Sequence, residues 1–187
     1  MCILFLAACS DSLPIETNMK ESVASFTYTS QHDESFGLAD LEGKWWIADF
    51  IFTNCETVCL PMTSNMAQLQ TNLAEQNLDV HLVSFSVDPD YDTPEVLKEY
   101  GDEYDANYDN WTFVTGYSFQ EIKELSVKSF RAPLKEPEHG SDQVLHDTRF
   151  FLVNPEGKIV KGYDGVPANT IDDIVADLLA LQDDGLL

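Results

Sequence analysis

Two cysteines with three residues between them stand in the segment DFIFTNCETVCLPMTSNM, residues 49–66. Cys55 and Cys59 follow a run of apolar residues and precede a stretch with helical periodicity. Two thiols at this spacing can bind one soft metal ion, cycle between dithiol and disulfide, or form a structural disulfide. The rest of the sequence has to distinguish these three chemistries.

The local geometry of the pair permits either metal binding or a redox role. If residues 55–59 are helical, their side chains at i and i+4 share one face, with Cβ atoms about 5–6 Å apart. If they form a loop that enters a helix, the separation is adjustable. A helix N-terminus lowers the pKa of a nearby thiol and so favours the thiolate that either chemistry needs. Two sulfurs alone hold copper(I) loosely and copper(II) poorly, so a third ligand such as imidazole is expected.

Four histidines could supply that imidazole. His81 lies within an apolar strand pattern, which is typical of a core histidine with a hydrogen-bond partner. His32 belongs to a predicted N-terminal hairpin, and His139 to an acidic loop. His146, in VLHDTRFFLV, stands just before a predicted core strand, where loops can reach the same end of the sheet as the cysteines. Position therefore favours His146.

The elements that would position these residues alternate between strands and helices. Apolar runs predict buried strands, and apolar residues at helical spacing predict the helices. In chain order we expect a hairpin within 24–44, a strand at 45–52, a helix at 61–76, a strand at 80–87, a helix from Thr93, a strand at 111–116, a helix capped by Ser118, a hairpin within 149–165, and a helix capped near Asn169 or Thr170. This order predicts an α/β, thioredoxin-like fold with a central mixed sheet flanked by helices and an N-terminal hairpin extension.

Two further patterns refine the helix predictions. Met62 and Met66 could act as soft thioether ligands, but Leu69 and Leu73 continue the same stripe, which favours core packing. Phe119, Ile122, Leu125 and Val127 are expected on or near one face of their helix.

Composition limits the partners. The chain of 187 residues is 44% hydrophobic and carries 10 basic against 33 acidic residues, a formal net charge of −23. It has the length of one globular domain with a sizeable core. The charge argues against nucleic acid and against docking on an anionic lipid surface, because few groups are available to neutralise phosphates. It would attract a cationic partner or a metal ion, although solubility or adaptation to a salty exterior is the favoured interpretation of the charge.

The N-terminus, MCILFLAACSDS, resembles a bacterial lipoprotein signal that ends before a lipidated cysteine. On this interpretation residues 1–8 are removed, Cys9 carries lipid, residues 9–23 form a flexible tether, and residues 24–187 form the domain. The expected location is the extracytoplasmic face of the cell membrane, held by the lipid. No Lys or Arg precedes the apolar stretch, which leaves open a start further upstream.

Three blocks of the sequence resemble the signatures of the Sco (SenC) family: DFIFTNCETVCLPMT, SFSVDPDYDTPEVLKEYG and VLHDTRFFLVNPEGKIV. This likeness covers roughly residues 25–182 and is closest to the Gram-positive lipoprotein branch. Members of the family are membrane-tethered, thioredoxin-like copper proteins that help to assemble the CuA centre of cytochrome c oxidase. Many members have proline directly after the second cysteine, whereas Leu60 intervenes here before Pro61, so the helix is expected to start slightly differently.

The resemblance implies that Cys55, Cys59 and His146 bind copper, as Cu(I) or Cu(II), and that Asp88 lies near the site as an outer residue. Asp88 could equally be a turn residue before Pro89. The protein would deliver copper to the oxidase subunit carrying CuA, or reduce the cysteines of that subunit. Other copper chaperones or thiol reductases are further candidate partners.

Other classes of function remain open at this point. A thiol-disulfide oxidoreductase without a metal would usually carry two residues between its cysteines and a cis-proline facing them, and the RFFLV strand lacks a preceding proline. A peroxiredoxin would place Thr and Arg partners differently. A structural disulfide over so short a loop stabilises little. Zinc bound by two cysteines, a histidine and Asp88 remains compatible with the ligand types.

Overall fold

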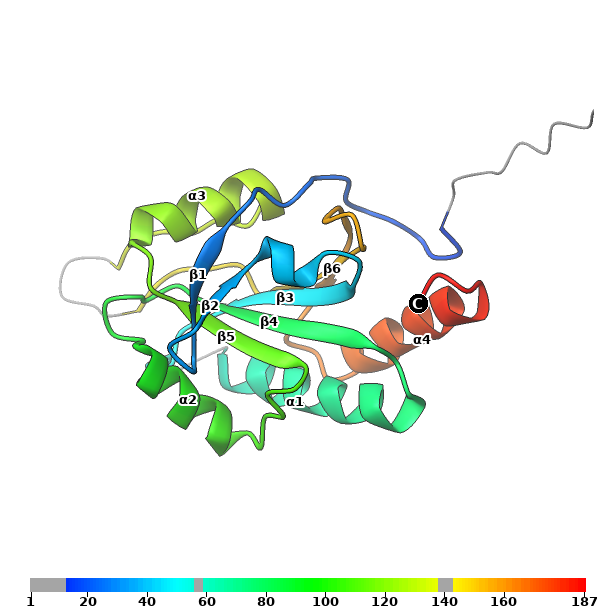
Figure 1. Cartoon of the computed structure of the whole chain (residues 1–187), viewed down its shortest axis with the longest axis horizontal. Coiled ribbons are helices and arrows are strands. Elements are labelled where there is room, and N and C mark those ends of the chain that lie inside the picture. Colours follow the sequence, from blue (N-terminus) through cyan, green and yellow to red (C-terminus); the bar gives the residue numbers. More distant parts are fainter. Residues whose placement is uncertain (1–12, 56–58, 138–142) are drawn as a thin grey trace, which may run out of the picture.

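The structure, a computed structural model, describes residues 13–55, 59–137 and 143–187, and of Cys59 only the backbone (Figure 1). Its centre is a seven-stranded mixed sheet in the order β2-β1-β5-β4-β3-β6-β7. The strands are β1 Thr27–Ser30, β2 Ser35–Gly37, β3 Trp45–Ile51, β4 Val80–Ser86, β5 Trp111–Thr115, β6 Arg149–Val153 and β7 Ile159–Asp164. The predicted α/β fold and the N-terminal hairpin are confirmed.

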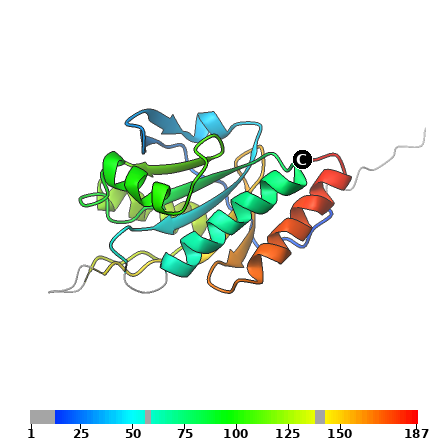
Figure 2. The same cartoon turned by 90° about the horizontal axis from the view of Figure 1, so that it is seen from below.

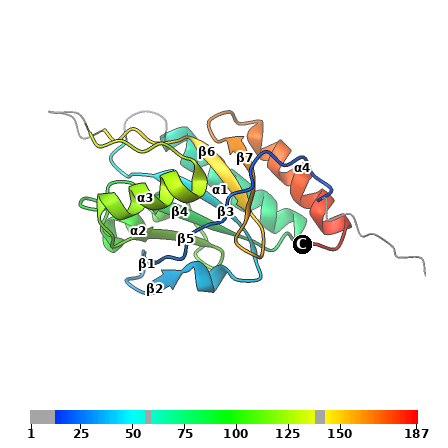
Figure 3. The ribbon, with the colours of Figure 1, turned by 90° about the horizontal axis from the view of Figure 1, so that it is seen from above.

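Helices cover both faces of this sheet, as the views from below and from above show (Figures 2 and 3). One core cluster joins the sheet to α1, α2 and α4, and the other joins it to α3. The Met62–Met66–Leu69–Leu73 stripe is fully buried in the first cluster, so its predicted packing role is confirmed. The helices are α1 Cys59–Gln76, α2 Pro94–Glu103, α3 Phe119–Phe130 and α4 Thr170–Asp183, with a 3-10 turn at Leu38–Leu41.

Strand directions decide what gathers at each end of the sheet. β3, β4 and β5 run parallel, whereas β6 runs antiparallel to β3. The carboxyl ends of β3 and β4 therefore share one edge with the start of β6. The segments 52–55, 87–93 and 143–148 all lie at this edge, which we call the carboxyl edge.

Helix boundaries agree with the sequence at two sites and differ at two others. The Thr93 side chain accepts a hydrogen bond from Val96, and Ser118 forms a capping box with Glu121. α1 begins at Cys59 rather than Pro61, because a proline fits anywhere in a first helical turn, where its missing N–H costs nothing. At α4, Asn169 makes no side-chain cap, and the Thr170 hydroxyl instead donates to the carbonyl of Asp164.

The expected position of Val127 on the apolar face of α3 is wrong. Its side chain is 44% exposed, whereas Ile122, Ser126 and Phe130 are buried. Residues four apart return to one helical face, and position 127 lies off the stripe that these three residues define.

Among the helices in the described ranges, none is long and apolar enough to cross a bilayer.

Candidate metal centre

The loop after β3 brings Cys55 to the carboxyl edge. Cys55 is 8% exposed and belongs to the same apolar cluster as Phe52 and Val144. The Gln143 side-chain amide donates to the carbonyl oxygen of Asn54 at 3.1 Å. The segment before Cys55 is thus hydrogen-bonded to the segment before His146, although the two are far apart in the sequence.

His146 lies on the segment that enters β6, half-buried beside the loop of Cys55. Its ring packs edge-on against Phe52, with centroids 5.7 Å apart. Nδ1 lies 2.8 Å from the carbonyl oxygen of Asp147, which can only accept, so Nδ1 carries the proton in this conformation. A neutral imidazole in this tautomer presents Nε2 as its acceptor nitrogen.

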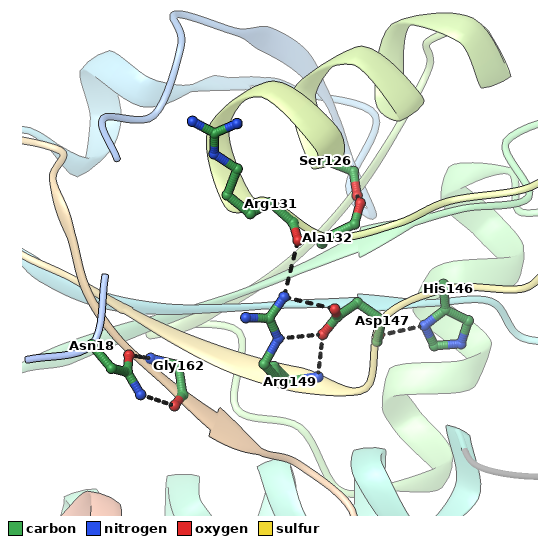
Figure 4. Close-up of polar contacts among 8 residues, drawn as sticks. All are labelled: Asn18, Ser126, Arg131, Ala132, His146, Asp147, Arg149 and Gly162. Carbon is green, nitrogen blue, oxygen red and sulfur yellow. Dashed lines mark hydrogen bonds and ion pairs between the residues drawn. The ribbon is translucent and has the colours of Figure 1, made fainter. Parts of the chain in front are cut away.

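Asp147 and Arg149 stabilise the backbone on which His146 sits (Figure 4). Arg149 donates from Nε and Nη2 to the two carboxylate oxygens of Asp147, at 2.8 and 2.7 Å. A third bond runs from Nη2 to the carbonyl oxygen of Arg131, at the end of α3. This bidentate geometry is the stronger form of a carboxylate–guanidinium contact. It links the His146 segment to the neighbouring helix.

We expect Arg149→Gln to lower the free energy of unfolding by about 1 kcal/mol, since charge-assisted bonds that are partly exposed contribute on that scale. Urea unfolding measures the loss. Lys128→Gln is the matched control, because Lys128 forms an exposed pair with Glu124 and its side chain is 70% exposed, against 34% for Arg149. Equal losses in the two variants would contradict a structural role for the Asp147–Arg149 pair.

Asp92 connects the loop of Cys55 to the turn after β4. This carboxylate is fully buried and accepts bonds from the Thr53 amide at 3.3 Å, the Thr53 hydroxyl at 2.6 Å and the Ser86 hydroxyl at 2.5 Å. Burial raises its pKa to about 6, although the bonds from Ser86 and Thr53 pull it down, and the charge of Asp88 adds to the increase. Sequence reasoning missed this residue, because the DPDYD segment does not show which of its acids turns inward.

Asp88 itself is half-buried at the start of that turn. Its carbonyl oxygen accepts bonds from the backbone amides of Tyr91 and Asp92, and its own backbone amide donates to the Ser86 hydroxyl oxygen. These contacts fit the turn role that the sequence left open. A position near a bound metal remains a prediction for Asp88.

Asp49 is a second buried acid that sequence reasoning missed. It alternates with Phe50 along β3 and lies on the face covered by α1, fully buried between Ile47 and Ile51. Neither carboxylate oxygen makes a hydrogen bond to any residue that the structure describes. Burial raises the pKa of Asp49 to about 7. The hydroxyl dipole of Ser84, which lies opposite Asp49 on β4 outside hydrogen-bonding geometry, and the charge of His146 offset only part of that effect. The signal was visible as the single charge in the apolar run WWIADFIF.

The other predicted residues are distributed as follows. Cys59 is the first residue of α1, while Cys9 and His139 lie outside the described residues. His81 bonds to the Thr112 hydroxyl at 2.9 Å, and burial lowers its pKa to about 4, as suits a neutral core histidine. His32 packs on Tyr108 in the hairpin region. Within the described part of the chain no three His, Cys, Asp or Glu side chains form a ready metal cage, and the side chain of Cys59 is not included there.

Fold and site together define a thioredoxin-like protein with two cysteines at the β3–α1 junction and a histidine at the start of β6. The family model described as SCO1/SenC matches residues 15–182. The chain belongs to this family.

Three similar proteins illustrate the likeness. The chain is 47% identical over 175 residues to the SCO1 protein homolog of Bacillus subtilis, covering 94% of this chain and 90% of that protein. A SCO1/SenC family lipoprotein from Bacillus anthracis superposes with a TM-score of 0.83 at 44% identity, over 87% of this chain and 95% of that one. BsSco, a cytochrome c oxidase assembly protein with a disulfide switch, superposes with a TM-score of 0.82 at 46% identity, over 90% of this chain and 98% of that one.

A more distant structure of the family contains a metal. ScoI of Arabidopsis thaliana, solved with copper bound, superposes with a TM-score of 0.70 at 28% identity, over 83% of this chain and 97% of that one.

Proposed function

We propose that this protein is a copper-binding, thiol-redox-active assembly factor for cytochrome c oxidase. In this proposal Cys55, Cys59 and His146 are the copper ligands. The observation that carries it is the juxtaposition of two distant segments: the loop of Cys55 is bonded through Asn54 to Gln143 and packs through Phe52 against His146. Family membership and the copper-bound Arabidopsis relative support the choice of metal.

The donor set suits copper. Thiolate sulfur and imidazole nitrogen are ligands that copper accepts in low coordination numbers. Cys59 begins α1, so the helix N-terminus favours its thiolate. The burial of Cys55 excludes water from its side of the site. Bound copper would be the ion that is delivered, or would supply a one-electron redox centre. The chain would hold and orient the three donor atoms.

The thiol pair couples binding to redox state. Two reduced thiols lose two protons when they become thiolate ligands. When the pair forms a disulfide, two electrons and two protons pass to an oxidant, and the sulfurs no longer act as thiolates. In the reverse direction the dithiol can reduce a disulfide of a partner by exchange through a mixed disulfide. The disulfide switch of BsSco supports this part of the proposal.

The proposed partner is the oxidase subunit that carries CuA, which would receive copper or have its cysteines reduced. Other copper chaperones or thiol reductases would load or reset the protein. Lipidation of Cys9 would hold the domain at the extracytoplasmic membrane surface. The predicted 9–23 tether is shorter than expected, because Ile15 and Val23 are buried in the domain and Asn18 exchanges two hydrogen bonds with the backbone of Gly162 (Figure 4). The lipoprotein relative from Bacillus anthracis supports the lipid anchor.

The test is a visible absorption spectrum of the reduced protein with one equivalent of copper(II). A thiolate-to-copper charge-transfer band is expected in the native protein and should disappear in Cys55→Ser and His146→Ala. His32→Ala is the matched control, because this exposed histidine lies beside Tyr108 in the hairpin region and should leave the band intact.

Two results would contradict the ligand set: a band that survives His146→Ala, or no band in the native protein under conditions where Cys55 and Cys59 rapidly form a disulfide. The second result would favour a thiol-disulfide oxidoreductase without a physiological metal. A competition assay with a copper(I) chelator then tests for a copper(I) site.

A further inference from the structure

Exposed apolar side chains gather around the candidate metal centre. In the described ranges, five large hydrophobic residues are exposed: Leu60, Tyr91, Val127, Leu145 and Leu186. Leu60 directly follows Cys59 in α1, and Leu145 directly precedes His146. Tyr91 lies in the turn that Asp92 connects to Thr53. Three of the five therefore lie at the carboxyl edge of the sheet.

These three side chains are substantially solvent-accessible. Leu60 is 52% exposed, Tyr91 54% and Leu145 59%. Leu145 also lines a hollow of about 370 Å³ together with His146 and Pro133. Single exposed apolar residues are ordinary, but several beside one functional site are typical of a surface that another molecule covers.

The charges around this surface are mostly negative. Asp90 and Glu95 are exposed on either side of Tyr91 in the sequence, and Asp88 is half-buried. Of the nearby cations, Arg149 bonds to Asp147 and Lys98 to Asp102. Lys135, whose backbone pairs with that of Leu145, is an exposed positive charge among these acids. A complementary surface would be basic at its rim and apolar at its centre. The negative charge of this face also disfavours binding to anionic lipid.

We propose that Leu60, Tyr91 and Leu145 form a docking face for a protein whose contact surface has an apolar centre and a basic rim. This inference rests on the proposed function and identifies the surface through which the copper or thiol partner binds. The apolar side chains would exclude water from the transfer site, and the acidic residues would steer the partner. Transfer between two metal sites needs the donor ligands within reach of the acceptor, and Leu60 and Leu145 are the sequence neighbours of Cys59 and His146.

The test uses the reduced, copper-loaded protein and, as the probe, the purified apo CuA domain of the oxidase from the same organism. Stopped-flow absorbance follows copper transfer to the domain. Leu60→Ser, Tyr91→Ser and Leu145→Ser are each expected to slow bimolecular transfer about tenfold, since a buried apolar anchor commonly contributes one factor of ten in affinity. Raising the salt concentration should slow the native reaction as well.

Leu186→Ser is the matched control. Leu186 is 45% exposed, and its carbonyl accepts a bond from Trp45 at the start of β3, at the opposite edge of the sheet. This variant should transfer at the native rate. Copper affinity, measured by chelator competition, should stay native in Tyr91→Ser, which separates docking from metal binding.

The outcomes distinguish the two proposals. If native protein transfers copper and all three variants do so at its rate, the docking face is overturned while the function stands. If native protein binds copper but neither binds nor loads the domain, the proposed function fails, and the docking proposal fails with it. Docking is also overturned if the three residues instead mediate binding to zwitterionic vesicles or self-association in sedimentation experiments.

Discussion

Replacing Asp49 with asparagine is expected to stabilise the protein at pH 8 far more than at pH 4. The difference in unfolding free energy between variant and native protein should grow by roughly 4 kcal/mol over this range, because the pKa of the carboxyl rises from 3.8 to about 7 on folding. Urea unfolding of both proteins at each pH measures it. The effect is large because Asp49 is fully buried without a hydrogen-bond partner among the described residues.

The sign follows from the two pKa values. The carboxyl has an ordinary pKa of 3.8 when unfolded, and burial raises it to about 7 in the fold. Below the lower value both states are protonated and nothing is lost. As pH rises toward 7 the unfolded state ionises first, so the native protein progressively loses stability. An asparagine does not titrate and escapes this loss.

Asp183→Asn provides the control, since this acid is exposed near the end of α4 and its replacement should give nearly the same small change at both pH values. A variant whose advantage is equal at pH 4 and pH 8 would show that Asp49 is ionised in the fold or paired. Titration of other acids, including Asp92, is common to both proteins and cancels in the comparison.

Replacing Asp92 with alanine is expected to weaken copper binding by roughly 10- to 100-fold, the usual loss when a residue that orients a metal-binding loop is removed. Asp92 accepts three hydrogen bonds from Thr53 and Ser86 and so holds the loop two residues before Cys55. Without the Asp92 carboxylate the Thr53 amide loses its acceptor. The loop then loses more conformational entropy when it brings the Cys55 thiolate to the metal. Competition with a copper(I) chelator measures the affinity.

Asp90→Ala is the matched control for this second prediction. Asp90 is exposed in the same turn and should leave copper affinity unchanged. Thermal unfolding of each variant establishes that the protein is folded at the assay temperature. Native copper affinity in folded Asp92→Ala would contradict a role for Asp92 in positioning Cys55. An equal loss of affinity in Asp90→Ala would show that the loss comes from removing a negative charge in this turn.

Local patterns in the sequence were enough to predict most elements. The fully buried strand β3 follows from an unbroken apolar run, and the caps at Thr93 and Ser118 follow from side chains that bond to the next turn. Both signals act between residues close in the chain, so no tertiary information is needed to recognise them. The exposed Val127 shows the limit, because one residue's shift along a helix changes the face that it occupies.

The arrangement of the site needed the tertiary structure. Sequence alone indicated Cys55, Cys59 and His146 as candidates, but the contact of Phe52 with His146 exists because β6 pairs antiparallel with β3. The inward turn of Asp92 and the isolation of Asp49 were equally hidden, since burial and hydrogen bonding depend on neighbours that only the packed sheet supplies. Residue types and their spacing determined which chemistry this protein could perform, while strand order decided which of those residues meet, because pairing across a sheet joins segments that share no local signal.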